Sequence, residues 1–171
     1  LTGFDQPDSG EWTFNGRPLA GIAPYKVARM GMVRTFQLTK ALSKLTVIEN
    51  MRLGATGQKG ERLLSALLKP LWRAQEDANT ARAEEILTRF KLDTKRDDFA
   101  GSLSGGQRKL LEMARALMVQ PELVMLDEPM AGVSVEDVDG LVDVIRSVHA
   151  EEGRTVLMVE HRMEVVVGLA Q

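Results

Sequence analysis

The clearest pattern of hydrophobic and polar positions lies in the second half of the chain. After Ser104, apolar residues recur at helical spacing. These residues are Leu110, Leu111, Ala114, Leu117 and Met118. Pro121 ends the pattern, because the residue before a proline avoids the α region. The apolar run 123–126 follows, as in a strand buried on both faces of a parallel sheet. The stretch predicts a helix followed by a buried strand.

Similar patterns predict further elements on both sides of this pair. Residues 11–16 alternate polar and apolar and end at Asn-Gly, which predicts a strand entering a hairpin-like turn. We expect a short helix over 24–30, a strand over 32–36 and a second buried strand over 155–159, with a helix starting at Arg162. The helix after Pro129 should face inward with Val138, Leu141, Val142, Ile145 and Val148.

The middle of the chain, residues 38–100, has a helical character. A helix capped near Thr46 should come first. The leucines at 63, 64, 67 and 68 share one face, which Pro70 and Trp72 should end. A second helix should face inward with Ala78, Ala81, Ile86, Leu87 and Phe90. The leucine-rich stripe suits either a membrane surface or core packing within a helical subdomain, and we favour the core.

Composition limits the classes of protein. The chain has 171 residues with 44% hydrophobic content, enough for one sizeable core. A net charge of -2 gives no general preference for nucleic acid or anionic lipid. The absence of cysteine excludes disulfides, thiolate metal sites and cysteine nucleophiles. No apolar run approaches the roughly 20 residues of a membrane span, so we expect a soluble chain.

Two segments carry candidate chemistry. Ser104, Gly105, Gly106 and Gln107 open a helix, where free N–H groups and glycines that allow close approach can seat an anion such as phosphate. The same turn could be only a helix cap. Asp127 and Glu128 end the buried strand, at the edge where open α/β sheets bind ligands. An acidic pair there could equally cap the next helix.

In this order and spacing, the segment 103–129 resembles the signature motif and the Walker B motif of ATP-binding cassette (ABC) ATPases. The resemblance implies an α/β fold, a P-loop NTPase-like ABC ATPase core with a mostly parallel sheet, flanking helices and an inserted α-helical subdomain. It implies ATP and Mg²⁺ as ligands. By this resemblance Asp127 would bind Mg²⁺, and Glu128 would be the general base for the attacking water.

The resemblance extends to other positions. Residues 34–37, Arg-Thr-Phe-Gln, are similar to the Q-loop, so Gln37 would contact Mg²⁺ and the attacking water and relay the nucleotide state. His161 matches the switch histidine that would hold the γ-phosphate, although a lone histidine is more often structural. Ser104–Gln107 would cover a nucleotide held by a second subunit. Ser134 stands in the D-loop where the family commonly has aspartate or asparagine. We expect no role for His149.

The motifs divide the chain into three parts. Residues 1–37 would be the first part of the ATPase core, 38–104 the helical subdomain and 105–171 the rest of the core. No GxxxxGKS or GxxxxGKT phosphate loop occurs. We therefore expect a fragment truncated at both ends, lacking the P-loop and nearly inactive by itself.

A narrower resemblance is to the ATPase subunits of branched-chain amino acid importers, carried by residues 1–4, 28–31, 33–37, 46–50, 127–129, 131–132 and 160–161. It implies a second ABC ATPase subunit, two transmembrane permease subunits and, indirectly, a periplasmic or extracellular substrate-binding protein, but no nucleic acid. The expected location is cytoplasmic, peripheral on the inner face of the cell membrane. The alternatives are an export ATPase of the lipopolysaccharide type, or a non-transport or regulatory cassette without hydrolysis.

Overall fold

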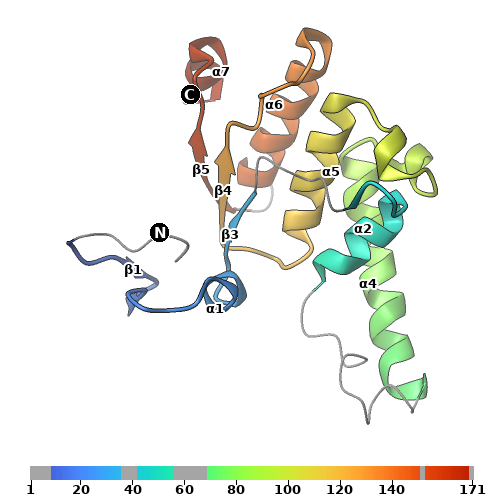
Figure 1. Cartoon of the computed structure of the whole chain (residues 1–171), viewed down its shortest axis with the longest axis horizontal. Helices are drawn as coiled ribbons and strands as arrows, with labels where there is room; N and C mark the ends of the chain where they lie inside the picture. Colours follow the sequence, from blue (N-terminus) through green and yellow to red (C-terminus); the bar gives the residue numbers. More distant parts are fainter. Residues whose placement is uncertain (1–8, 36–41, 56–68, 151–152, 170–171) are drawn as a thin grey trace.

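The computed structural model describes residues 9–35, 42–55, 69–150 and 153–169. Its central sheet consists of β3 (Met32–Arg34), β4 (Leu123–Asp127) and β5 (Thr155–Val159), in this order and all parallel. The predicted mostly parallel sheet is therefore confirmed. Figure 1 shows the three strands side by side, with their carboxyl ends leading to the loops that carry the candidate chemistry.

A hairpin and a short helix precede the sheet. β1 (Thr13–Phe14) and β2 (Arg17–Pro18) pair antiparallel around Asn15 and Gly16. Both turn residues have positive φ, 49° and 73°, as the favoured two-residue hairpin turn requires. Helix α1 (Pro24–Arg29) starts with a proline. Proline lacks a backbone N–H, and this costs nothing at the first helical position because an N–H there makes no hydrogen bond within the helix. The predicted strand, turn and helix are confirmed.

The helical part contains α2 (Val47–Gly54), α4 (Lys69–Arg89) and the 3-10 turns η3 (Asp93–Lys95) and η4 (Ala100–Ser102). Helix α5 (Gly105–Leu117) leads back to β4 and packs on α2 and α4, as Figure 1 shows. α6 (Val135–Ala150) connects β4 to β5, and α7 (Met163–Leu169) follows β5. No helix among the described residues is long and apolar enough to cross a membrane.

Helix α4 begins at Lys69 and includes Pro70 in its first turn, where a proline costs no helical hydrogen bond. One expectation about this helix is wrong. Ala78 and Ala81 are exposed, and Ala83 is buried instead. The buried face of α4 therefore consists of Ala83, Ile86, Leu87 and Phe90, which recur at helical spacing. The large side chains among them determine which side of the helix faces the core. The leucines predicted at 63–68 lie outside the described residues.

The two faces of the sheet differ. Val124, Leu126, Val156 and Met158 face the core formed with α5 and α6, as the alternation along a strand requires. On the opposite face, Met32 and Met125 are covered by Leu19 and Val27 of the hairpin and α1 region. These two groups of residues make up the two hydrophobic cores of the described chain, and the larger one continues into the helical part.

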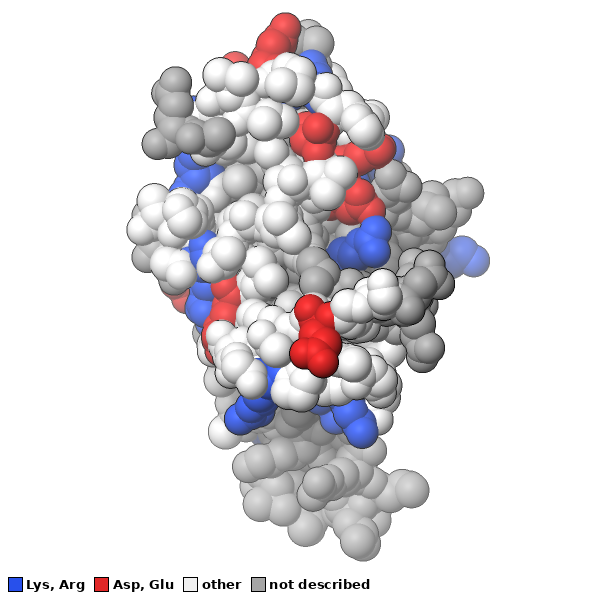
Figure 2. Space-filling view, turned by 90° about the vertical axis from the view of Figure 1, so that its left-hand side faces the viewer, with Lys and Arg blue, Asp and Glu red and all other residues white. Residues whose placement is uncertain are grey.

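The prediction that β5 is buried on both faces is wrong. Leu157 is 44% exposed and Val159 is 54% exposed, because no described element covers this side of β5. Met163 and Val167 of α7 are exposed as well. Figure 2 views this side of the molecule and shows a broad central area without Lys, Arg, Asp or Glu. The core accounts only for Val156 and Met158, which pack on it from the other face of β5.

Candidate nucleotide site at the carboxyl edge of the sheet

The candidate acidic residues and His161 lie together where β4 and β5 end. Asp127 is the last residue of β4, and it pairs in register with Val159, the last residue of β5. Glu128 follows β4, and His161 follows β5 after one intervening residue. The parallel pairing therefore brings residues that are distant in sequence to the same edge of the sheet.

The backbone at Glu128 directs its side chain toward the end of β5. Glu128 has φ 46°, an uncommon value for a residue other than glycine, and its N–H donates to the carbonyl oxygen of Val159 at 2.9 Å. Nε2 of His161 lies 3.0 Å from Oε1 of Glu128, so the imidazole donates to the carboxylate. The side chain of His161 is 80% exposed and that of Glu128 is 32% exposed. The pair is therefore accessible from solvent.

Glu160 ties the two loops together, and the sequence analysis assigned it no role. Its Oε2 accepts the N–H of Met130 at 3.2 Å, in the loop after β4. Its Oε1 accepts the N–H groups of His161 and Arg162, at 3.1 and 3.3 Å. One carboxylate thus fixes the backbone on both sides of the His161–Glu128 contact. The sequence signal that could have identified Glu160 is its position directly before the candidate histidine.

Asp127 has a partner that the sequence analysis also missed. Nη2 of Arg34, on β3, lies 2.5 Å from Oδ2 of Asp127. The register explains the contact: Arg34 is opposite Met125, and Met125 and Asp127 point to the same face of the sheet because they are two residues apart. Asp127 and Glu128 therefore have separate cationic or polar partners, although they are neighbours in sequence.

The start of α5 is a complete capping box. The hydroxyl of Ser104 accepts the N–H of Gln107 at 3.1 Å, and Oε1 of Gln107 accepts the N–H of Ser104 at 3.0 Å. The Gln107 side chain is therefore used within the cap in this conformation. Gly105 and Gly106 supply the other N–H groups of the first turn, which is the part of the helix able to seat an anion.

The two glycines also let α5 approach the loop that follows β4 and the first turn of α6. A Cβ on Gly105 would lie 2.8 Å from the carbonyl oxygen of Gly132, and a Cβ on Gly106 would lie 2.6 Å from Cγ of Asp137. Ser134 donates from its hydroxyl to Oδ2 of Asp137 at 3.0 Å. The segment predicted to be the D-loop is thus in direct contact with the segment predicted to be the signature. Gln37 lies outside the described residues.

The residues at the edge fit a magnesium ion only in combination with a nucleotide. Mg²⁺ takes one or two carboxylates and completes its shell with waters and phosphates, and Asp127 offers one such carboxylate with 27% of its side chain exposed. Among the described residues, no group of three or more His, Cys, Asp or Glu could hold a metal. The donor set therefore suits a cation shared with phosphates, not a site made by protein alone.

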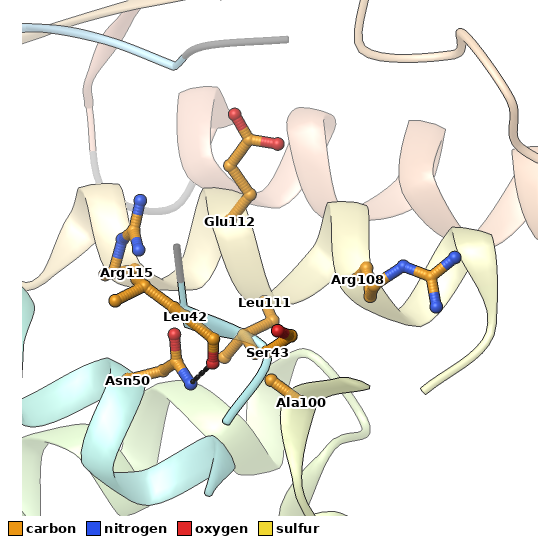
Figure 3. A pocket seen from close by; sticks show the side chains of 8 residues that line it. All are labelled: Leu42, Ser43, Asn50, Ala100, Arg108, Leu111, Glu112 and Arg115. Carbon is orange, nitrogen blue, oxygen red and sulfur yellow. Dashed lines mark hydrogen bonds between the residues drawn. The ribbon is translucent and has the colours of Figure 1, made fainter. Parts of the chain in front are cut away.

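A separate hollow lies beside α5, between α2 and η4 (Figure 3). The buried Asn50 anchors its wall by donating to the carbonyl oxygens of Leu42 at 3.1 Å and Thr46 at 2.9 Å. Glu112, only 5% exposed, and Arg115 line it from α5. Burial lowers the pKa of Arg115, and the charge of Glu112 opposes that shift. The hollow shares no residue with the Glu128–His161 pair.

Comparison with known proteins places these features in a family context. The sequence profile described as ABC transporter matches residues 1–131. The high-affinity branched-chain amino acid transport ATP-binding protein LivG of Salmonella typhimurium is 37% identical over 171 residues, covering 99% of this chain and 67% of that protein. BraF of Pseudomonas aeruginosa, described in the same words, is 34% identical with the same coverage.

A probable LivG of Archaeoglobus fulgidus is 38% identical, covering 97% of this chain and 63% of that protein. Among solved structures, a nucleotide-free ATP-binding cassette from an ABC transporter is 35% identical, with a TM-score of 0.81 over 98% of this chain and 66% of that one. Another such cassette, in its ADP conformation, is 36% identical with a TM-score of 0.80, over 98% of this chain and 65% of that one. The chain thus spans about two thirds of the length of these relatives.

Proposed function

Because the chain belongs to the ABC transporter family, we propose that it is part of a subunit that binds and hydrolyses ATP to drive transport. The observation that carries the proposal is the 3.0 Å contact between His161 and Glu128, directly after Asp127, at the carboxyl edge of a parallel sheet. A general base, a histidine that can hold a phosphate and a metal-type carboxylate at this edge suit hydrolysis of a phosphoanhydride.

In the proposed reaction, Glu128 is the general base. Its carboxylate would accept a proton from the water that attacks the γ-phosphorus of ATP, and ADP would leave as the bond to the bridging oxygen breaks. His161 would hold the Glu128 carboxylate through Nε2, or the γ-phosphate once the nucleotide is present. Glu160 would keep His161 in place through the backbone hydrogen bonds at 3.1 and 3.3 Å.

Asp127 would hold Mg²⁺, together with Gln37, whose position is outside the described residues. When bound, the ion would supply charge neutralisation for the nucleotide phosphates. The chain's own contribution is a carboxylate on a short, well-paired strand, which fixes its direction before any ligand arrives.

The signature residues would act on a nucleotide held by a second ABC ATPase subunit. Ser104, Gly105, Gly106 and Gln107 lie at the start of a 13-residue helix, so their N–H groups and the helix dipole would stabilise negative charge on the γ-phosphate. Contact of Gly105 with Gly132 supports a coupling between this segment and the loop after Glu128. Dimerisation is thus part of the proposed mechanism.

The names of the relatives, which are branched-chain amino acid transport ATP-binding proteins, support a proposal about the cargo. We propose an importer subunit for branched-chain amino acids or a related small amide or amino acid. It would work with two permease subunits and, indirectly, a substrate-binding protein, at the cytoplasmic face of the membrane. The 171-residue chain alone should hydrolyse ATP poorly, since it has no GxxxxGKS or GxxxxGKT loop to grip the β- and γ-phosphates.

The test is Mg²⁺-dependent ATPase activity of the complete gene product, beside Glu128→Gln and the matched control Glu85→Gln, an exposed acid on α4. We expect the Glu128 variant to bind ATP but to lose about 100-fold or more in turnover, the size of a general-base contribution. The Glu85 variant should match the wild type. Equal turnover in all three proteins would contradict the role of Glu128, and a wild type without activity would favour a regulatory cassette.

A further inference from the structure

The ion pair between Arg34 and Asp127 is the contact of the candidate site that the proposed reaction leaves unused. It joins the carboxyl ends of β3 and β4 through Nη2 and Oδ2, 2.5 Å apart. The side chains of Arg34 and Asp127 are 38% and 27% exposed. A guanidinium thus lies at the carboxylate that the proposed function gives to a magnesium ion.

The position of Arg34 is fixed by more than its charge. Its backbone is in register with Met125, and the next residue, Thr35, is 6% exposed and donates its N–H to the carbonyl oxygen of Met125 at 2.9 Å. Arg34 therefore lies on the same face as Asp127 in a well-held strand. The contact is a product of the sheet register, not of a side chain that happens to swing near.

We propose that Arg34 is a positioning residue that neutralises Asp127 in the absence of metal and competes with the divalent cation for that carboxylate. The inference rests on the proposed function. A positive charge beside the carboxylate repels a doubly charged ion, whereas fixing one aspartate side chain saves only the freedom of two rotatable bonds. The repulsion is therefore the larger effect, and Arg34 lowers cation affinity while it keeps Asp127 oriented.

This arrangement has a consequence for the empty and loaded enzyme. Without a cation, the Arg34–Asp127 pair bridges the ends of β3 and β4. With the cation on Asp127, the same carboxylate is shared or the guanidinium is released. Arg34 thus sets the threshold cation concentration at which the site loads, and it ties loading to the attachment of the end of β3.

The test uses the complete gene product with Mn²⁺ as a paramagnetic substitute for Mg²⁺, in the presence of saturating ADP. Free Mn²⁺ is measured by electron paramagnetic resonance for wild type, Arg34→Met and the charge-retaining Arg34→Lys. We expect Arg34→Met to bind Mn²⁺ roughly three- to tenfold more tightly, and Arg34→Lys to stay close to wild type. In an Asp127→Asn background, Arg34→Met should have a smaller effect on Mn²⁺ binding, because the competition for the carboxylate is gone and only the repulsion remains.

If the wild type binds Mn²⁺ with ADP and Arg34→Met binds it equally or more weakly, the role proposed for Arg34 is wrong. The proposed function is unaffected by that result. A wild type that binds no Mn²⁺ with ADP would overturn the proposed function and this inference with it. If Arg34→Met does not fold, a measurement on the wild-type protein still tests the proposal. The Nε–H resonance of Arg34 in ¹⁵N-arginine-labelled protein, identified by its loss in Arg34→Lys, should shift when Mg²⁺ and ADP are added. An unshifted resonance at saturating Mg²⁺ contradicts the proposal.

Discussion

Asp127 and Glu128 show how the backbone separates two adjacent carboxylates. Asp127 ends β4 with regular strand geometry and faces Arg34, whereas Glu128 leaves the strand with φ 46° and faces His161. Each carboxylate therefore has its own hydrogen-bond donor, and the two can take different proposed roles.

A glycine substitution in the signature segment tests the close approach between α5 and α6. We expect Gly106→Ala to destabilise the protein by about 1–3 kcal/mol, the usual cost of overpacking. The added Cβ would lie 2.6 Å from both Cβ and Cγ of Asp137, so the whole Asp137 side chain would have to move. The measurement is the midpoint of thermal unfolding of the complete gene product.

Gly140→Ala is the matched control, because a Cβ there meets nothing within 4 Å and Gly140 lies inside α6. Replacing an exposed helical glycine with alanine should stabilise by about 0.5–1 kcal/mol. A Gly106→Ala protein as stable as the Gly140→Ala protein would contradict the packing argument.

The candidate residues could be located from the sequence, but their partners could not. Asp127, Glu128 and His161 follow apolar runs that are strands in the structure, so local pattern was sufficient to place them at strand ends. The contact of Arg34 with Asp127 depends on the register between β3 and β4. A one-residue slip would send the side chain to the other face, and no local pattern specifies the register of parallel strands.

At the scale of elements, predictions succeeded where local chemistry determines the structure. The Asn-Gly turn and the helix near Thr46 are determined by residues within a few positions of each other. The predictions failed where the burial of an element depends on residues that are distant in the sequence. The rotation of α4 depends on what α2 and α5 present to it, which left Ala78 and Ala81 exposed. Burial of β5 depends on which elements lie against its second face.

The capping box of α2 makes the stability of this helix depend on pH. Glu49 accepts the N–H of Thr46 at 2.8 Å, and hydrogen bonds from Thr46 lower the pKa of the Glu49 carboxyl. A lowered pKa in the folded state means that the stabilisation is present at neutral pH and is lost as the pH falls through the folded value. We expect Glu49→Gln to lose stability at pH 7 and to approach the wild type at pH 3, by urea midpoints.

Thr46→Ala removes the other half of the box and should cost about 1 kcal/mol at pH 7. The relevant control is Thr88→Ala, since the Thr88 hydroxyl donates to the carbonyl oxygen of Glu84 inside α4 at 2.9 Å. If Glu49→Gln differs from the wild type by the same amount at pH 3 and pH 7, the carboxylate does not contribute through its charge.

For the whole molecule, the difference between the faces of the sheet is the main organising feature. One face packs on α5 and α6 and forms the large core with the helical part. Among the described residues, the other face is covered by the hairpin and α1 region over β3 and β4, and no described element covers β5 there. The candidate site lies at the end of this sheet, where the buried strand β4 carries Asp127 and the partly exposed strand β5 leads to His161.

The open side of β5 should make the 171-residue chain associate with itself when it is produced alone. Leu157, Val159, Met163 and Val167 are exposed on β5 and α7, and an edge strand beside apolar side chains is a template for pairing with another chain. We expect sedimentation velocity to show association that grows with concentration, and Leu157→Lys to reduce it because a lysine on an edge strand opposes pairing. Leu53→Lys is the matched control, the same change at a 60% exposed leucine on α2. If both variants associate like the wild type, the chains contact each other at a surface other than β5. If both variants reduce association equally, the added positive charge is responsible and not its place on β5.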